Sequence, residues 1–315
     1  MDIEKVLIVG KGALGLLYGD IIARHLGPDA VRYLMDDARY ERHANDEPPT
    51  INGTPCAIGN VRASEAGIAD LVIVAVKATG FEAALDSMEQ VVGPDTRVVS
   101  LMNGITSERR IAERFGWSGT VLAVAQGMDA AFLGRALTFA HEGEVRFGAA
   151  PLTSPDAVHD IAAFFDRAGI AYTVEDDIEH RLWVKFMLNV GVNQTCMVYG
   201  GTYGSVSDPD GEQHRSFLAA MREVQAVARA EGVELSEDDL DSMVRIITTL
   251  HPDGMPSMAQ DRLNRRRSEV ESFSGTVIAL ADKHGIHVPQ NRLLYRRVQE
   301  IEAEYSCART GGTLS

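Results

Sequence analysis

Two patterns of hydrophobic positions divide this chain of 315 residues. In the first half, short runs of branched apolar residues alternate with longer segments whose apolar positions recur every three or four residues. The short runs are typical of buried parallel strands, and the longer segments are typical of amphipathic helices. This alternation predicts a doubly wound α/β domain. The expected strands are residues 5–9, 30–35, 70–76, 97–102 and 119–125, and helices are expected over residues 14–26 and 81–91.

The pattern changes in the middle of the chain. Residues 136–150 contain two strand-like runs around a glycine, which predicts a hairpin at the edge of the sheet. A helix should begin after Ser154, which can cap it, with Pro155 in its first position, and should end at Gly169. Residues 170–178 are expected to contain the last strand.

From about residue 179 the chain shows only helical periodicity. We therefore predict two domains, an α/β domain over residues 1–178 and an all-α domain over residues 179–315. A single hydrophobic core seldom organises a chain of 315 residues, which agrees with this division. The expected helical segments are residues 180–198, 212–231, 237–250, 258–284 and 289–305.

Composition narrows the classes of function. A net charge of −15 argues against a nucleic-acid-binding protein, whose affinity depends on basic side chains. Cys56, Cys196 and Cys307 are widely spaced and form no CxxC pair, which fits a reducing cytoplasm. The chain has no signal peptide and no apolar run that could cross a bilayer, so we expect a cytoplasmic protein without membrane contact. The nine histidines lack ligand spacing, so we expect no metal.

A glycine-rich turn follows the first expected strand and precedes the first expected helix. Its spacing is GxGxxG, in which the first glycine permits a tight turn and the second lets the backbone approach a pyrophosphate. The third lets helix and strand pack closely, and the helix N-terminus offers N–H groups to the anion. The alternative is a glycine turn without a ligand, but this context favours a Rossmann-type site for a dinucleotide. The residues expected to contact it are Gly10, Lys11, Gly12, Ala13, Leu14 and Gly15.

The end of the second strand usually selects between NAD and NADP. Asp36 or Asp37 could accept a hydrogen bond from a ribose 2′-hydroxyl, which favours NAD. Arg39 and Arg42 follow closely and could pair with a 2′-phosphate, which favours NADP. The same residues would also suit an ordinary solvated helix start. These residues alone leave the choice open.

Two further polar residues stand at the carboxyl ends of expected strands. Lys77 follows the third strand and Asn103 follows the fourth. Ligands of open α/β sheets bind at these ends, so both are candidate nucleotide contacts. The alternatives are a surface lysine and a plain Asn-Gly turn.

An unusual polar stripe occurs in the apolar segment "WVKFMLNVGVNQT". Lys185, Asn189 and Asn193 lie four residues apart, so on a helix they span only about 80°. A buried ammonium is rarely unpaired, so the stripe either faces solvent or lines a polar cavity. Asparagine is a poor helix former, which favours the cavity. We expect the stripe to face the cleft between the two domains.

These motifs together resemble the ketopantoate reductase family (2-dehydropantoate 2-reductases). "GKGALG", "VKA", "MNG", "KFMLNVGVNQT" and "SMAQDRLNRRRSEVESFSG", followed by "HGIHVPQN", occur in the family's order over nearly the whole chain. The resemblance implies an NAD(P)-dependent oxidoreductase acting on a CH–OH group. The implied reaction reduces a 2-oxo acid, most simply 2-dehydropantoate to pantoate in pantothenate biosynthesis. A homodimer is possible.

The resemblance also assigns roles to individual residues. The N-terminal domain would bind the dinucleotide, and the helical domain would carry the catalytic and substrate-binding residues. Asn103 matches the amide beside the nicotinamide. Lys185 matches the catalytic lysine, which would act as general acid; Asn189 and Asn193 match substrate-binding amides, Ser257 the serine near the substrate carboxylate, and Glu269 an active-site acid that also contacts the nicotinamide ribose.

Two positions depart from the family's pattern. Many members have Arg at the end of the second strand, where this chain has Asp36. Some members have a further substrate-binding Asn where this chain has Tyr203. We therefore expect NADPH, with Arg39 or Arg42 on its 2′-phosphate, and Asp36 leaves NADH open. The alternative functions are reduction of a different branched 2-oxo acid and a non-catalytic NAD(P)-binding redox sensor.

Overall fold

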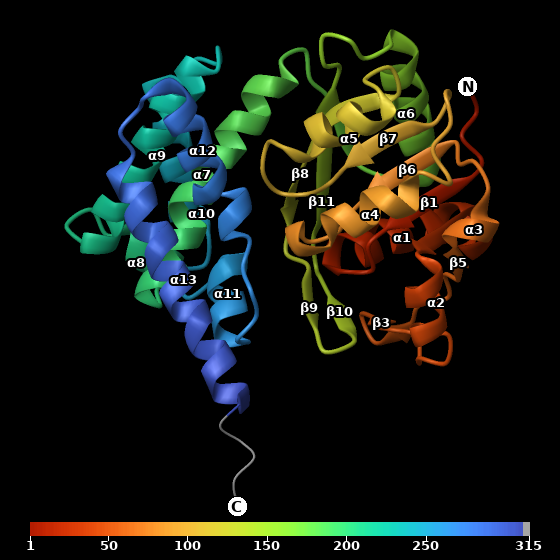
Figure 1. The fold of residues 1–315 in the computed structure, drawn as a ribbon, viewed down its shortest axis with the longest axis horizontal. Helices are drawn as coiled ribbons and strands as arrows, with labels where there is room; N and C mark the ends of the chain where they lie inside the picture. The colour runs from red at the N-terminus through yellow and green to blue at the C-terminus, as the bar shows by residue number, and fades with distance from the viewer. Residues whose placement is uncertain (311–315) are drawn as a thin grey trace, which may run out of the picture. The chain divides into compact units, whose positions relative to one another are not determined.

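A computed structural model describes residues 1–310, with side chains through Tyr305, so the side chain of Cys307 lies outside the described residues. The chain divides into two compact units, residues 1–179 and residues 180 onward, one residue after the boundary expected from the sequence. The first unit is a sheet covered by helices, and the second is helical throughout its described residues (Figure 1). The expected fold class is confirmed.

The first unit is built on an eight-stranded sheet with the order β12-β11-β8-β7-β6-β1-β2-β5. The six strands from β5 to β8 are parallel, and read in that direction their order along the chain is third-second-first-fourth-fifth-sixth. This is the classic doubly wound order, and strand order reverses between β1 and β6. The strands are β1 (Val6–Val9), β2 (Val31–Met35), β5 (Asn60–Arg62), β6 (Leu71–Val74), β7 (Arg97–Ser100), β8 (Thr120–Met128), β11 (Glu142–Gly148) and β12 (Tyr172–Val174).

Two hydrophobic cores cover the two faces of this sheet. Val6 and Ile8 of β1 belong to one core, with side chains from α1 and α6, while Leu7 and Val9 belong to the other, with side chains from α3, α4 and α5. Every position of β1 is therefore buried, as expected for a central parallel strand. The helices are α1 (Ala13–Leu26), α2 (Asp37–His43), α3 (Ala63–Ala66), α4 (Phe81–Met88), α5 (Ser107–Phe115) and α6 (Pro155–Ala168), with short 3₁₀ turns η1 (Pro28–Ala30) and η2 (Ala78–Gly80).

The hairpin predicted within residues 136–150 is wrong. The second half of that segment, β11, instead pairs with β8 in an antiparallel ladder. Gly143 lies inside this ladder with φ +68°, and a Cβ there would stand 2.2 Å from the carbonyl oxygen of Gln126. The glycine therefore marks a close approach of two strands, not a turn. The real hairpin joins β9 (Ala131–Leu133) to β10 (Ala136–Thr138), and both belong to a second sheet with β3 (Thr50–Ile51) and β4 (Thr54–Pro55).

The second unit is a bundle of helices. The continuous helix expected over residues 258–284 is broken, because the chain leaves the helix at Asn264 and Arg265 has φ +49°. Ser268 then anchors the link, with its N–H and hydroxyl both bonded to Glu302 Oε1 at 2.8 and 2.6 Å. The helices are α7 (Ile178–Tyr199), α8 (Tyr203–Ser207), α9 (Glu212–Ala230), α10 (Glu237–Thr249), α11 (Ser257–Leu263), α12 (Ser274–His284) and α13 (Pro289–Thr310), with the 3₁₀ turn η3 (Val270–Ser272).

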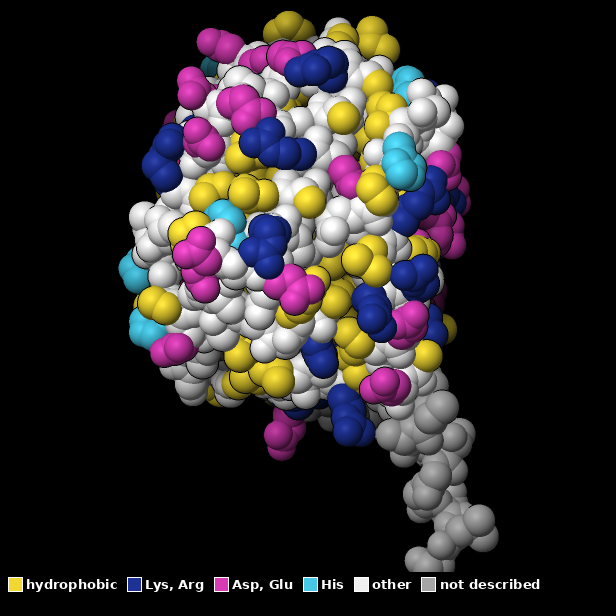
Figure 2. Space-filling view, turned by 90° about the vertical axis from the view of Figure 1, so that its left-hand side faces the viewer, with side chains coloured by type: hydrophobic (Ala, Val, Ile, Leu, Met, Phe, Trp, Pro, Cys, Tyr) yellow, Lys and Arg dark blue, Asp and Glu magenta, His cyan; other side chains and the backbone are white. Residues whose placement is uncertain are grey.

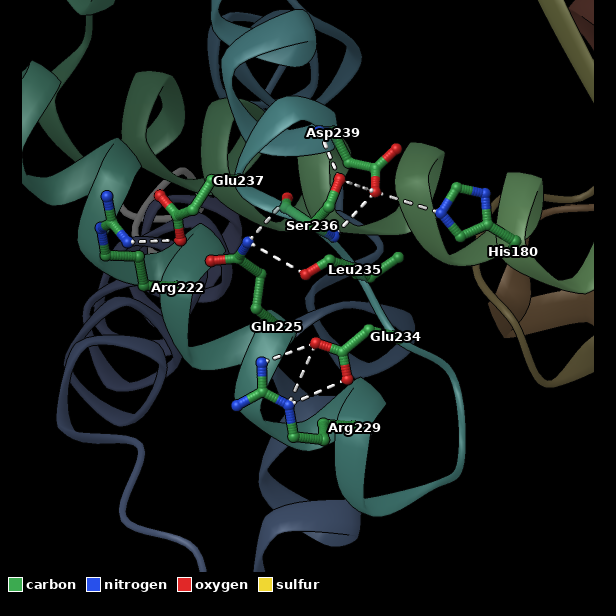
Figure 3. Close-up of polar contacts among 9 residues, drawn as sticks. All are labelled: His180, Arg222, Gln225, Arg229, Glu234, Leu235, Ser236, Glu237 and Asp239. Atoms are coloured by element: carbon green, nitrogen blue, oxygen red, sulfur yellow. Dashed lines mark hydrogen bonds and ion pairs between the residues drawn. The ribbon is translucent and has the colours of Figure 1, made fainter.

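The start of α7 is held by a polar cluster at the start of α10 (Figure 3). The ring of His180 lies 3.1 Å from Asp239 Oδ2, and that carboxylate also accepts from the N–H of Ser236 at 2.7 Å. Gln225 of α9 donates to the carbonyls of Leu235 and Ser236 at 3.3 and 3.0 Å. These contacts fix the first turn of α7 and thereby the face that the helix presents along its length.

Acidic and basic side chains are interspersed with hydrophobic ones on the face shown in Figure 2. Such a mixture is typical of an ordinary solvated protein surface. None of the described helices combines the length and the apolar character that crossing a bilayer requires.

Candidate functional site

The glycine-rich turn combines two closely packed glycines with open space at the N-terminus of α1. Gly10 has φ +111°, and a Cβ there would lie 2.4 Å from the carbonyl oxygen of Ala75. A Cβ on Gly15 would lie 1.9 Å from the carbonyl oxygen of Gly10, so both glycines are required by packing. Gly12 is the N-cap of α1, and apart from its immediate surroundings along the chain no protein atom lies within 4 Å of the place where its Cβ would be. The open space therefore lies directly beside the helix N-terminus, where anions bind.

The residues that follow these glycines tie the turn to the sheet. Lys11 donates from Nζ to Asn60 Oδ1 at 3.0 Å, and the ammonium lies 4.8 Å from the ring centroid of Tyr33. Burial lowers the pKa of Lys11. Ala13 and Leu14 form the first turn of α1 and pack partly against the core. The turn is thus held in place by both polar and apolar contacts.

A cavity opens at the carboxyl ends of β1, β2 and β6, where strand order reverses. Lys11, Asp36 and Arg39 contribute to its walls, together with apolar residues such as Val76 and Ala84. A groove of about 490 Å³ adjoins it and shares Asp36 with it. Doubly wound sheets bind their ligands at this switch point, and the groove has the size of a small-molecule site.

Asp36 directly follows β2 and caps α2. Its Oδ1 accepts the N–H of Arg39 at 2.7 Å. Arg39 is exposed at the cavity, and Arg42 is exposed in the last turn of α2. With Asp37 in the first turn of α2, all four candidate selectors of the cofactor therefore belong to one short helix and its N-cap.

Lys77 and Asn103 lie at the same edge of the sheet as the glycine turn. Lys77 is exposed after β6, and Asn103 is half-buried after β7. The loop that carries Asn103 rests on a buried network that sequence reasoning missed. Ser107 Oγ donates to Glu108 Oε2 at 2.8 Å and lies 2.9 Å from Ser100 Oγ. Glu108 is only 1% exposed, and no local pattern distinguishes such an acid from a surface residue of α5.

The polar stripe of α7 has a half-buried end and a buried end. Lys185 and Asn189 are half-buried, and Asn193 is 5% exposed. Asn193 Nδ2 donates to Asn189 Oδ1 at 3.3 Å, and its Oδ1 accepts from Ser257 Oγ at 2.9 Å and from the N–H of Met258 at 3.3 Å. The helical unit therefore brings together three predicted substrate residues. It also gives Asn193 a structural role, because this amide caps the start of α11.

The remaining candidates lie on the links of the helical unit. Glu269 is half-buried at the start of η3, between α11 and α12. Tyr203 is half-buried at the start of α8, and burial raises the pKa of its hydroxyl to about 12. A hydroxyl with that pKa stays protonated at neutral pH and can donate a hydrogen bond. Among the described residues, no group of three or more His, Cys, Asp or Glu side chains could hold a metal ion.

Replacing Asn193 by alanine should destabilise the helical unit. The change removes the acceptor of the Ser257 hydroxyl and the Met258 N–H, and unsatisfied buried donors cost about 1–3 kcal/mol. Urea unfolding should show a free energy of unfolding lower by about this amount. Asn189→Ala is the matched control, because Asn189 is only half-buried, and it should lose less than half as much. Equal stability of the two variants would contradict the structural role of Asn193.

Comparison with known proteins identifies the family. The family described as ketopantoate reductase PanE/ApbA matches residues 6–151, and its C-terminal domain matches residues 177–302. The chain belongs to the ketopantoate reductase family. The resemblance expected from the motifs is confirmed, and the protein is an oxidoreductase acting on a CH–OH group with a nicotinamide cofactor.

Individual relatives are similar over almost their whole length. The 2-dehydropantoate 2-reductase of Streptococcus pyogenes serotype M6 is 26% identical over 310 residues, covering 95% of this chain and 98% of that protein. The crystal structure of a PanE/ApbA family ketopantoate reductase from Ralstonia eutropha JMP134 has a TM-score of 0.81 and 27% identity, covering 96% of this chain and 99% of the other.

Two more distant structures share the fold. A ternary structure of D-mandelate dehydrogenase with NADH and anilino(oxo)acetate has a TM-score of 0.83 at 21% identity, covering 96% of this chain and 99% of the other. A dimeric ketopantoate reductase from Staphylococcus aureus has a TM-score of 0.76 at 19% identity, covering 95% and 99%. The same two-part fold therefore occurs in enzymes with different names.

Proposed function

We propose that this protein reduces a 2-oxo acid to a 2-hydroxy acid with a nicotinamide cofactor, most simply 2-dehydropantoate to pantoate. The main support is the contact of Asn193 with both Asn189 and Ser257. Asn189 and Asn193 lie on the same helix as Lys185, and Ser257 begins α11. The contact places two amides and a hydroxyl together, which suits a small acid with hydroxyl groups. The membership of the ketopantoate reductase family supports the same substrate class.

The residues of the first unit fit the cofactor. The open space at Gly12 and the N-terminus of α1 would receive the pyrophosphate, with Lys11 holding the turn. Lys77 and Asn103 would contact the nicotinamide half, because they follow β6 and β7 at the same edge. When bound, the reduced nicotinamide supplies the hydride. The family resemblance favours NADPH with Arg39 on its 2′-phosphate, whereas Asp36 favours NADH.

Lys185 is the proposed general acid. Its ammonium can polarise the substrate carbonyl by donating a hydrogen bond to the oxygen, and it can then transfer the proton from Nζ to that oxygen. Glu269 is the proposed second acidic group and would also contact the nicotinamide ribose. The proposal thus assigns the proton donor to the second unit, whereas the proposed cofactor contacts other than Glu269 belong to the first.

Asn189 and Ser257 are the proposed substrate-orienting groups. The hydroxyl of Ser257 would hold the carboxylate, and the amide of Asn189 would bond a substrate hydroxyl. Asn193 fixes both of them through the contacts described above.

We also propose a homodimer, as reported for the Staphylococcus aureus relative, and light scattering in solution gives the mass that tests it.

Substrate profiling tests the proposed function. We expect the highest kcat/KM with ketopantoate and lower values with 2-oxoisovalerate, which lacks the hydroxyl, and with phenylglyoxylate. A preference for either of the latter acids would reject ketopantoate but keep the reaction type. Absence of turnover with every 2-oxo acid, despite nucleotide binding, would instead favour a redox sensor.

A further inference from the structure

We propose that the cofactor site selects NADH over NADPH, because carboxylates at the carboxyl end of β2 exclude a 2′-phosphate. The inference rests on the proposed function and adds a preference for NADH, whereas the family resemblance favours NADPH. It concerns residues of the first unit only, chiefly Asp36 and its neighbours in the groove beside the cavity.

Asp36 occupies the place where a 2′-phosphate would otherwise be attracted. In doubly wound domains the ribose 2′-position lies at the end of the second strand, and Asp36 directly follows β2. Its Oδ1 bonds the N–H of Arg39 at 2.7 Å, so this N–H at the start of α2 already serves a carboxylate. A 2′-phosphate at this position would be repelled by the negative charge of Asp36, whereas a ribose hydroxyl can donate a hydrogen bond to the Asp36 carboxylate.

The groove next to Asp36 carries two further carboxylates. Asp37 accepts the N–H of Ser64 at 3.3 Å, and hydrogen bonding by Ser64 lowers the pKa of Asp37, so this group is charged at neutral pH. Asp86 of α4 lies 2.8 Å from Arg114 in an exposed ion pair. The other lining residues are Ala38, Ala63, Ala83, Ser87 and Gln90, so the groove presents three acids and no base.

Two cations, Lys11 and Arg39, line the adjoining cavity, and neither compensates the negative charge of these acids. Lys11 is already bonded to Asn60 and lies over the ring of Tyr33. Arg39 is exposed whereas Asp36 is half-buried, so water and salt screen the attraction of Arg39 for a phosphate more strongly than the repulsion by Asp36. A phosphate monoester carries nearly two negative charges at neutral pH. The balance therefore favours a neutral hydroxyl at the ribose 2′-position.

The test measures binding, without turnover. Titrations of the full-length protein with NADH and NADPH should give a dissociation constant at least about tenfold lower for NADH. Asp36→Asn should reduce this ratio by about tenfold, the order of magnitude expected when one unit charge near a phosphate is removed at an intermediate effective dielectric. Asparagine is an equally good helix cap, so the variant should fold with an unchanged melting temperature. Competition with 5′-AMP and adenosine 2′,5′-bisphosphate should show the same shift.

Two control variants separate the possible outcomes. Asp156→Asn removes an exposed acid from the first turn of α6. The N–H of Ser154, at the start of this helix, donates to the carbonyl of Ser118, just before β8. Asp156 therefore lies at the amino ends of the parallel strands, away from the cavity. This variant should leave the ratio unchanged. Arg39→Ala alters a cation of the cavity wall and should weaken NADPH binding by much less than the tenfold effect of Asp36→Asn, because the Arg39 side chain is exposed and screened. Tighter binding of NADPH by the unaltered protein, weakened by Arg39→Ala, would overturn the inference and keep the proposed function. Failure to bind either nucleotide would reject the proposed function itself.

Discussion

Replacing Lys185 by alanine is expected to lower kcat for 2-oxo acid reduction by about 10²- to 10⁴-fold, the usual contribution of a positioned general acid. The half-buried ammonium on α7 is the proposed proton donor, and an alanine side chain cannot donate a proton to the carbonyl oxygen. The fall should appear in kcat and in kcat/KM alike, because the interaction strengthens as charge develops on that oxygen. Steady-state kinetics with saturating cofactor measure both constants.

Two controls make this result specific. Nucleotide affinity should survive in Lys185→Ala, because the glycine turn belongs to the other unit. Lys283→Ala removes an exposed lysine of the same unit, which pairs with Glu231 at 2.6 Å, and should leave kcat unchanged. A folded Lys185→Ala enzyme with near-normal turnover of ketopantoate would reject the proposed acid. A loss of nucleotide binding would show that the variant disturbs the fold.

Gly12→Val should abolish nucleotide binding while leaving the protein folded. Apart from atoms of the adjacent chain, no protein atom lies within 4 Å of the position of a Cβ at this residue, so the new side chain would fill the space proposed for the pyrophosphate. Loss of the pyrophosphate contact should weaken NADH and NADPH equally, and a fluorescence titration should show no saturation. Valine is a poorer helix cap than glycine, which costs about 1 kcal/mol of stability. Unchanged affinity would mean that the dinucleotide does not use this turn.

Gly10→Ala provides the contrast. Gly10 has φ +111°, and its Cβ would lie 2.4 Å from the carbonyl oxygen of Ala75, so alanine should lower the melting temperature clearly. The two glycines of one motif therefore have separable roles, one in packing and one in ligand access. Circular dichroism during heating distinguishes them.

The sequence predicted the elements with strong local patterns well. The five expected strands of the first half correspond to β1, β2, β6, β7 and β8. A parallel strand that is buried on both faces has a continuous run of apolar residues, and this run is visible in the sequence. The helix between Ser154 and Gly169 is confirmed as α6, because its cap, first proline and final glycine act within a few residues. The short strands β3, β4, β5 and β9 were missed, since segments of two or three residues carry no period.

Errors arose where distant residues decided the local conformation. Gly143 looks like a turn residue, but its neighbours across the ladder are Gln126 and Met128, and the pairing of β11 with β8 decides its role. The run after Asn264 has helical periodicity, but the bonds from Ser268 to Glu302 of α13 hold it out of a helix. No window of the sequence contains both partners of these contacts.

The candidate site shows the same division between local pattern and tertiary contact. The spacing of Gly10, Gly12 and Gly15 alone predicts the turn, because backbone conformation and helix start are properties of adjacent residues. The spacing of Lys185, Asn189 and Asn193 likewise predicts one stripe on a helix. Only the tertiary structure shows that Asn193 bonds Ser257, 64 positions away, and that Asp36 lines a groove together with Asp86. Polarity along a chain reveals which groups share a face, but their hydrogen-bond partners and neighbouring charges come from segments that folding alone brings together.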